Sequence, residues 1–271
     1  MVEKPSGQLW IGTYLDGLYG LKGGKLTHYT SKDGLAGNCA WTLHLDSEGQ
    51  LWIGTTRGLT RFKNGQMRTL TLKQGLFDDT VNSIVEDRFG DFWMSSNLGI
   101  HRASREDLNK VADGIKPQIE HVAYGVSDGM PDNETNGGNQ PSAIRSRDGT
   151  LWFPTLKGVV RLDPSKMWRN SLPPQMTIEE VVMDGETLDP GLPANLEAGR
   201  GGVFRIHFTA TSFVAPEKVR FRYRLEGSDR NWSEPTAIRA SYYTNLKPGE
   251  YKFQVVACNN HGCDKVIGEN S

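Results

Sequence analysis

Apolar and polar residues alternate in short segments through the first part of the chain, and turn residues separate these segments. Leu51–Thr55 is followed by similar segments at residues 59–63 and 66–72, and Asn64-Gly65 between the last two is a two-residue hairpin signal. Alternation with period two, interrupted by glycine and asparagine, is typical of antiparallel strands joined by tight turns. The pattern therefore predicts an all-β fold over this region.

One of these segments recurs along the chain. The string Gly49-Gln50-Leu51-Trp52-Ile53-Gly54-Thr55 has similar copies that begin at Gly7, Gly90 and Gly149. The tryptophans of the copies are separated by 42, 41 and 59 residues, and a period of about 40 residues indicates a four-stranded propeller blade. We expect about three to four blades in residues 1–163, which is too few to close a ring. The blades should therefore form an open arc with one exposed blade edge, unless a partner chain completes it.

The longest step between tryptophans contains a segment with helical signals. Residues 104–111 place Ser104 at the N-cap position, acidic residues in the first turn and Gly114 beyond the end. We therefore expect a short helix inserted into the third repeat, which accounts for most of the extra length.

The recurring tryptophans have two interpretations. They occupy one position per repeat, so we expect them to be structural and to pack between adjacent blades. Stacking of the rings on a sugar is the alternative. The four residues are Trp10, Trp52, Trp93 and Trp152.

The pattern changes beyond residues 164–174, which we interpret as a linker. In residues 219–225 and 251–255 the odd positions are apolar and the even positions are polar, as in half-buried strands of an antiparallel sandwich. We interpret residues 175–271 as an immunoglobulin-like or fibronectin type III-like β-sandwich domain. The even positions of its first such strand are Arg220, Arg222 and Arg224. These arginines form either a solvated face with cross-strand carboxylate partners or an anion-binding face.

The composition argues against several classes of binding partner. In 271 residues, 31 lysines and arginines stand against 32 acidic residues, for a formal net charge of −1. We therefore expect neither nucleic acid nor an anionic membrane as an obligate partner. No run of apolar residues is long enough for a transmembrane helix, and residues 1–5 lack the apolar segment of a signal peptide. Because the chain starts within a repeat, we expect it to be part of a longer protein.

The three cysteines do not form a disulfide framework. Cys39 lies in an apolar strand pattern and is expected to be a small buried hydrophobe. Cys258 and Cys263 flank residues 259–262, a good hairpin turn, and are compatible with a cross-strand disulfide or with two free thiols. A zinc site is less favoured, because no second pair of ligands is visible beyond His261.

Sequence patterns of catalysis are missing from the chain. We find no nucleophile elbow, no phosphate-binding loop and no paired spacing of metal ligands. We therefore expect no catalytic residue, no metal and no cofactor.

The propeller loops are the best candidates for recognition. By strand parity, the loop between the second and third strands of a blade shares one face with the loop that enters the next blade. The first kind of loop contributes Asp16, Arg57, Asn97 and Lys157, and the second contributes Asn38, Asp79, Asn133 and Asn136. Polar, planar groups of this kind would suit an oligosaccharide. The alternative is that they are ordinary turn residues.

Several motifs together resemble a known pair of domains. The turn Asp33-Gly34-Leu35, a strand that ends in Asp46 and the string at residues 49–55 look like two-component regulator propeller repeats. The stretch at residues 128–138 looks like the last propeller turn of that family. The second half looks like the triple-tyrosine (Y_Y_Y) domain that follows such propellers in the extracytoplasmic region of bacterial, including hybrid, sensor histidine kinases. Its three tyrosines would be Tyr223, Tyr243 and Tyr251.

The resemblance implies a ligand-sensing and signal-relay module, periplasmic or otherwise outside the cytoplasm, which detects a carbohydrate or another small ligand. It also implies a homodimer in the full-length receptor, whose membrane and kinase segments are not in these residues, and no enzymatic activity of the chain itself. Two alternatives stay open: a propeller lyase or glycosidase that acts on polysaccharide, and a non-catalytic secreted binding or scaffold module. The chain departs from the family in its few blades and at residues 260–263, where the family usually has a tryptophan after Asn-x-x-Gly.

Overall fold

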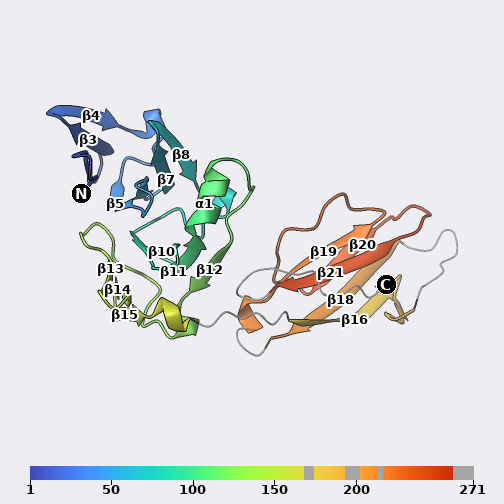
Figure 1. Cartoon of the computed structure of the whole chain (residues 1–271). Coiled ribbons are helices and arrows are strands. Elements are labelled where there is room, and N and C mark those ends of the chain that lie inside the picture. The colour runs from blue at the N-terminus through green and yellow to red at the C-terminus, as the bar shows by residue number, and fades with distance from the viewer. Residues whose placement is uncertain (168–173, 193–201, 213–215, 259–271) are drawn as a thin grey trace. The chain divides into compact units, whose positions relative to one another are not determined.

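The computed structural model describes residues 1–167, 174–192, 202–212 and 216–258. The chain divides into two compact units, Met1–Met167 and Trp168–Ser271 (Figure 1). Both are built almost wholly from antiparallel strands.

The first unit is a partial β-propeller of four blades. In each blade the strands follow one another in the sheet in chain order, and every pairing is antiparallel. The first strands of neighbouring blades contact one another, as they do around the axis of a propeller. The first blade holds β1 (Val2–Glu3), β2 (Leu9–Gly12), β3 (Leu18–Lys22) and β4 (Lys25–Tyr29), and the second holds β5 (Ala40–Leu45), β6 (Leu51–Thr55), β7 (Gly58–Lys63) and β8 (Gln66–Leu70). The third holds β9 (Ser83–Glu86), β10 (Asp91–Ser96), β11 (Gly99–Ser104) and β12 (His121–Tyr124), and the fourth holds β13 (Ile144–Arg145), β14 (Leu151–Thr155) and β15 (Gly158–Leu162).

The fourth blade has three strands, because the chain turns away after β15. Asp163 begins a short 3₁₀ helix, η4 (Pro164–Lys166), by accepting a hydrogen bond from Ser165 N at 3.0 Å. Proline at the first helical position cannot donate to a strand ladder. The outer edge of β15 therefore has no following strand from residues 163–167.

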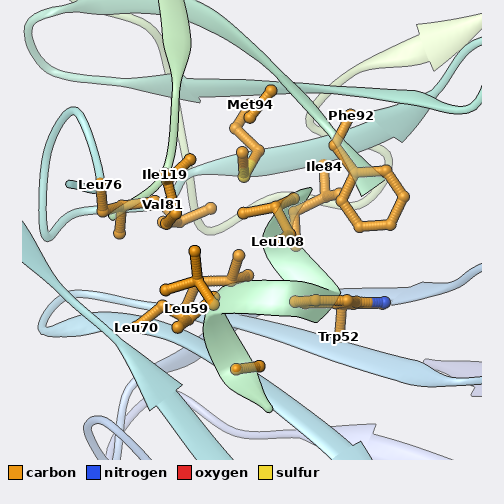
Figure 2. Packing of buried hydrophobic residues seen from close by; sticks show 13 residues of the cluster. Trp52, Leu59, Leu70, Leu76, Val81, Ile84, Phe92, Met94, Leu108 and Ile119 are labelled. Carbon is orange, nitrogen blue, oxygen red and sulfur yellow. The ribbon is translucent and has the colours of Figure 1, made fainter. Parts of the chain in front are cut away.

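Apolar clusters between neighbouring blades hold the propeller together. Trp52 is fully buried and meets Phe92 of the third blade edge to face, with ring centroids 5.2 Å apart (Figure 2). Trp10 meets Phe62 of the second blade in the same way at 4.9 Å. Gly54 lies at a close approach, since a Cβ there would come within 2.4 Å of Thr42 Cγ2. Successive side chains along a strand therefore point alternately into the interfaces with the two neighbouring blades.

The expected helix is present as α1 (Arg105–Ala112). Ser104 precedes it in an extended conformation but makes no capping hydrogen bond through its side chain. The helix instead docks by burying Leu108 and Val111 in the cluster around Trp52. Arg61 of β7 holds its C-terminal end by donating to Asn109 Oδ1 at 2.6 Å.

The second unit has two antiparallel sheets that enclose an apolar core. One sheet has the order β17-β16-β18-β20, and the other pairs β19 with β21. Their bounds are β16 (Gln175–Met183), β17 (Glu186–Leu188), β18 (Val203–Thr211), β19 (Arg220–Glu226), β20 (Ala240–Thr244) and β21 (Lys252–Cys258). Phe208 of the first sheet and Phe221 of the second meet in the core with ring centroids 5.2 Å apart. The predicted β-sandwich is therefore confirmed.

Two arginines of β19, Arg222 and Arg224, bind groups other than carboxylates within the described residues. Arg222 Nε donates to the backbone oxygen of Ser233 at 3.0 Å. Arg224 Nε donates to Gln254 Oε1 at 2.6 Å, and the guanidinium lies over the Trp232 ring. These two arginines thus serve the packing of the sheet.

The cysteines differ from expectation in one respect. Cys39 is free but only half-buried, because β5 begins one residue later and leaves it in the preceding loop. Cys258 at the end of β21 is disulfide-bonded, while its predicted partner Cys263 and the predicted turn before it lie outside the described residues.

Candidate binding site

The turn before the second strand of a blade is built on one side chain that satisfies several donors. Asp46 accepts hydrogen bonds from Gln50 N at 2.7 Å, Glu48 N at 3.0 Å and Trp52 Nε1 at 2.9 Å. The carboxylate therefore ties the hairpin to the indole ring that packs between blades.

The group that accepts the hydrogen bond from the tryptophan indole differs from blade to blade. Asp87 accepts from Trp93 Nε1 at 2.7 Å, and in the fourth blade Ser146 Oγ accepts from Trp152 Nε1 at 3.2 Å. In the first blade Lys4 occupies this position, and Trp10 Nε1 is buried without a hydrogen-bond partner among the described residues.

The two kinds of propeller loop do lie on one face. Backbone bonds join them around the unit: Ala40 N to Thr13 O at 2.9 Å, Val81 N to Thr55 O at 2.9 Å and Thr135 N to Ser96 O at 3.2 Å. Loops far apart in sequence are thus neighbours, as strand parity predicts.

Most of the predicted recognition residues on this loop face stabilise the loops themselves. Asn38 Oδ1, Asp79 Oδ1 and Asn133 Oδ1 occupy equivalent positions and accept from Ser31 N, Leu72 N and Val126 N at 2.9, 2.7 and 2.8 Å. Each bond closes a 3₁₀ turn of the repeat. These three side chains therefore act as turn residues in the structure.

Three others also have partners within the unit. Asp16 accepts from the Tyr19 hydroxyl, Asn97 accepts from Asn82 Nδ2 at 3.1 Å, and Lys157 pairs with Asp132 at 3.2 Å. Arg57 and Asn136 are left: within the described residues neither side chain has a hydrogen bond or ion pair. The structure does not bring the eight residues together into one cluster.

A groove lies at the end of the blades opposite the loop face, and the sequence analysis did not predict it. This groove has a volume of about 760 Å³ and is formed by the turns between the first and second strands of the second, third and fourth blades. It is lined by Ser47, residues 86–90, Arg105 and residues 145–149. The turn from β9 to β10 lies at one end of β10 and the Asn97 loop at the other, so the groove and the loop face lie on opposite sides.

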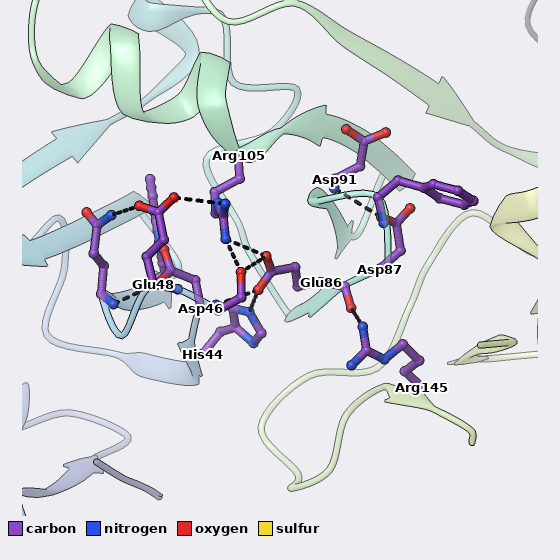
Figure 3. A network of polar contacts seen from close by, with 12 residues as sticks. His44, Asp46, Glu48, Glu86, Asp87, Asp91, Arg105 and Arg145 are labelled. Carbon is purple, nitrogen blue, oxygen red and sulfur yellow. Dashed lines mark hydrogen bonds and ion pairs between the residues drawn. The ribbon is translucent and has the colours of Figure 1, made fainter. Parts of the chain in front are cut away.

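Glu86 is the centre of the polar network in the groove (Figure 3). Its carboxylate accepts from Ser47 N at 2.9 Å and Ser47 Oγ at 2.7 Å, and it pairs with Arg105 Nη1 at 2.8 Å. His44 Nε2 lies 3.5 Å away. Burial alone would raise the pKa of Glu86, but the hydrogen bonds from His44 and Ser47 and the charge of Arg105 lower it to about 2. Glu86 is therefore ionised at neutral pH and holds Arg105.

The other carboxylates of the groove are also engaged. Asp87 accepts from the amides of Phe89 and Asp91 at 2.8 and 3.1 Å as well as from Trp93. Asp148 accepts hydrogen bonds from Ser146 Oγ at 2.6 Å and from Thr150 N at 3.0 Å. These bonds lower the pKa of Asp148 to about 2, and the bond from Ser146 has the largest effect. The acidic side chains thus fix the turns and the base of the groove.

Three arginines of the groove have no carboxylate partner among the described residues. Arg145 Nη1 donates to the backbone oxygen of Glu86 at 2.7 Å (Figure 3). Arg88 lies over the ring of Phe89 at 5.0 Å, and that ring is 61% exposed. Arg147 is exposed and has no hydrogen bond or ion pair within the described part of the chain. The groove therefore combines three arginines that have no carboxylate partner among the described residues with an exposed aromatic ring.

A signal for this groove was present in the repeat. Arg88 and Arg147 each follow the residue that accepts from the tryptophan, and Ser47 stands at that position in the second blade. Comparison of the variable positions beside the conserved turn pattern of the repeats would have drawn attention to them.

The predicted tyrosines of the second unit contribute to its packing. The Tyr223 ring lies 5.7 Å from that of Phe208. Tyr243 OH donates to Asp229 Oδ2 at 2.8 Å, and burial together with this bond raises the pKa of Tyr243. Tyr251 OH donates to Lys247 O at 2.7 Å.

The described residues offer neither a metal site nor a helix that could span a membrane. Over the residues that the structure describes, no group of histidine, cysteine and carboxylate side chains is placed to hold a metal ion. No helix in the described ranges has the length and apolar character needed to span a bilayer.

Comparison with known proteins finds two family models in this chain. Residues 34–57 match the two component regulator propeller, and residues 212–265 match the Y_Y_Y domain. These matches confirm the resemblance that the sequence motifs indicated.

The curated relative that this chain matches is much longer than the chain itself. Histidine kinase P4 of Formosa agariphila is 25% identical over 149 residues, which cover 51% of this chain and 11% of the relative. The chain therefore spans about a tenth of the length of that curated relative.

Solved structures with similar folds have low sequence identity. An extracellular domain assigned to the hybrid two component system BT4673 of B. thetaiotaomicron is 16% identical, with a TM-score of 0.46 over 96% of this chain and 42% of that one. Virginiamycin B lyase from Staphylococcus aureus is 18% identical, with a TM-score of 0.40 over 80% of this chain and 70% of that one. Both TM-scores lie below 0.5, so these two likenesses say nothing about what this chain does.

Proposed function

We propose that this chain, which joins two-component regulator propeller repeats to a Y_Y_Y domain, is a ligand-sensing and signal-relay module of a bacterial two-component sensor. The observation that carries this proposal is the order of the two matched families along one chain, at residues 34–57 and 212–265. The similarity to a histidine kinase over 149 residues supports it.

The propeller provides the binding surface in this proposal. Its turns are held rigidly by buried carboxylates such as Asp46 and Asp87, and a groove of about 760 Å³ opens between them. Rigid scaffolds that present polar loops around a hollow are a common arrangement for recognition. The ligand is a small extracellular molecule of the oligosaccharide class.

The second unit relays the signal. In the full-length receptor the β-sandwich passes a change in dimer geometry towards a membrane-linked kinase, and the module works outside the cytoplasm. The disulfide at Cys258 supports this location, because disulfides persist in oxidising compartments.

The role of these residues is binding rather than catalysis. A glycosidase or lyase needs a carboxylic acid or another group that gives up a proton near neutral pH. Glu86, a buried carboxylate of the groove, has a pKa lowered to about 2 and interacts with Arg105, His44 and Ser47. That environment suits a structural anchor.

The test is the reading frame that contains these residues, followed by the activity of the kinase it encodes. We expect a transmembrane segment and a histidine kinase downstream, and we expect autophosphorylation in membranes to change when one member of a panel of neutral and acidic oligosaccharides is added. A frame without a membrane-linked kinase would refute the proposal. So would product formation from a polysaccharide by the purified chain.

A further inference from the structure

The groove in the propeller is lined by charged side chains of both signs. Four arginines line it, and Glu86, Asp87 and Asp148 are the acidic residues of its wall. Each of these acids already accepts at least two hydrogen bonds from the protein. Among the described residues, the one ion pair between these acids and an arginine of the groove is that of Glu86 with Arg105.

Arg105 is the arginine that the wall does neutralise. It pairs with Glu86 at 2.8 Å and with Glu48 at 3.0 Å, and its backbone N–H donates to Gly90 O at 3.1 Å. Arg105 thus belongs to the framework of the groove.

The other three arginines are available to a ligand. Arg145 is oriented by one bond to the carbonyl oxygen of Glu86, which leaves donors of its guanidinium free. Arg88 and Arg147 occupy equivalent positions in consecutive blades, and both are exposed. Guanidinium groups bind carboxylate and sulfate oxygens in pairs of parallel hydrogen bonds, which a neutral sugar cannot offer.

Phe89 adds an apolar surface at the same place. It is 61% exposed, lies beneath Arg88 and lines the groove. A sugar ring packs its C–H face against such an aromatic ring, whereas a bare inorganic anion gains nothing from it.

From this arrangement we infer that the groove binds an acidic oligosaccharide, with Arg88, Arg145 and Arg147 contacting its carboxylate or sulfate groups and Phe89 packing against a sugar ring. The inference rests on the proposed sensing function and narrows its ligand to the anionic class. It also places the site at the strand turns rather than on the loop face that contains Arg57.

Isothermal titration calorimetry of the whole chain tests the inference. The probes are trigalacturonate, which carries carboxylates, a heparin tetrasaccharide, which also carries sulfates, and cellotriose, which is neutral. We expect one or both acidic probes to bind and cellotriose not to bind. The better acidic probe identifies the anionic group that the arginines prefer. Absence of binding by both acidic probes, or equal binding of cellotriose, would overturn the inference.

Variants locate the site. Arg147→Gln and Arg88→Gln remove exposed charges with no ion pair among the described residues, so the fold should be retained, as thermal melts would verify. Each is expected to weaken the acidic probe about tenfold or more, and Phe89→Ala to weaken the oligosaccharide but not inorganic sulfate. Arg57→Gln is the matched control, because it removes the same charge from the opposite face.

The controls separate specific binding from general attraction of charges. Equal weakening by Arg57→Gln and Arg147→Gln would mean that the probe responds only to net charge, and this would refute the site. Failure of the site leaves the reading-frame test unaffected, and a frame without a kinase leaves the calorimetry unaffected. The two proposals can thus fail separately.

Discussion

At the scale of single residues, the indole N–H of each repeat tryptophan needs an acceptor, and the preceding turn supplies it in three blades, although Trp152 of the last blade is only half-buried. Asp46 and Asp87 do so with carboxylates, and Ser146 does so with a hydroxyl group. The first blade keeps the same turn backbone, since Lys4 N donates to Gln8 O at 2.9 Å as Asp46 N does to Gln50 O at 3.0 Å. The ammonium group of Lys4, however, cannot accept a hydrogen bond.

Lys4→Asp should therefore stabilise the propeller. The new carboxylate would meet Trp10 Nε1, which is buried without a partner among the described residues, in the geometry that Asp46 has with Trp52. We expect a gain of about 1–2 kcal/mol in the free energy of unfolding, measured by urea denaturation at pH 7.

Two further variants control this prediction. Lys4→Ala removes the lysine without adding an acceptor and should give no comparable gain. Asp46→Ala removes three hydrogen bonds and leaves Trp52 Nε1 buried, so it should cost about 3 kcal/mol. If Lys4→Ala stabilised the chain as much as Lys4→Asp, charge rather than hydrogen bonding would explain the gain.

His101 makes stability depend on pH. It is fully buried, neither ring nitrogen has a partner among the described residues, and Phe77 and His121 lie beside it. Burial, with a smaller contribution from His121, lowers the pKa of His101 from 6.5 to about 3. Burial also lowers the pKa of His121. The unfolded chain binds the proton first, so the contribution to stability is complete above about pH 6.5 and is lost as the pH falls towards 3.

His101→Leu should flatten this dependence. Between pH 7.5 and pH 5 we expect the wild-type chain to lose about 2 kcal/mol more than the variant, from urea denaturation at both pH values. His28→Gln is the control, because His28 is exposed in the folded chain. Parallel pH profiles for wild type and His101→Leu would contradict this account.

At the scale of elements, α1 shows how an insertion becomes part of the core. Leu108 is fully buried in the cluster that contains Trp52 and Phe92 (Figure 2). Arg61 holds the far end of the helix through Asn109. The helix therefore covers the interface between the second and third blades.

Leu108→Ala should destabilise the propeller by about 3 kcal/mol through lost burial and an unfilled cavity. Glu106→Ala on the exposed side of the same helix removes only the pair with Lys110 at 2.7 Å and should cost less than about 0.5 kcal/mol. Urea denaturation of both variants provides the measurement. Equal effects would mean that α1 contributes through its own helicity and not through docking.

Elements of this kind could be predicted because their signals are local. The tryptophan spacing, the Asn64-Gly65 hairpin and the end of α1 shortly before Gly114 all follow from backbone preferences and periodicity within a few residues. Ser104 is the N-cap residue as predicted, although its side chain makes no capping hydrogen bond, and packing of Leu108 in the core helps to hold the helix.

The binding groove could not be predicted in the same way. Whether an arginine is free depends on partners far away in sequence: Arg105 is neutralised by Glu48 and Glu86, whereas Arg147 is not neutralised. On the other face, Asn38 and Asp79 have suitable chemistry for a ligand but are already bound to Ser31 N and Leu72 N. Residue type therefore suggested the chemistry and the structure decided its availability.

At the scale of the whole molecule, two units with separate cores lie on one chain. The clusters around Trp10, Trp52 and Trp93 belong to Met1–Met167, and the cluster around Phe208 belongs to Trp168–Ser271. Because each core cluster of the described residues is formed within one unit, we expect each unit to unfold cooperatively by itself.

Scanning calorimetry should therefore resolve two transitions that respond to different changes. Lys4→Asp should raise only the transition of the propeller. Reduction of the disulfide at Cys258 should lower only that of the β-sandwich, by an amount equivalent to about 2 kcal/mol. Cys39→Ser tests whether the free thiol contributes, and it should leave the response to reductant unchanged. A single transition that moves with both changes would show that the two units unfold as one, and a ligand bound to the propeller would then stabilise the β-sandwich directly.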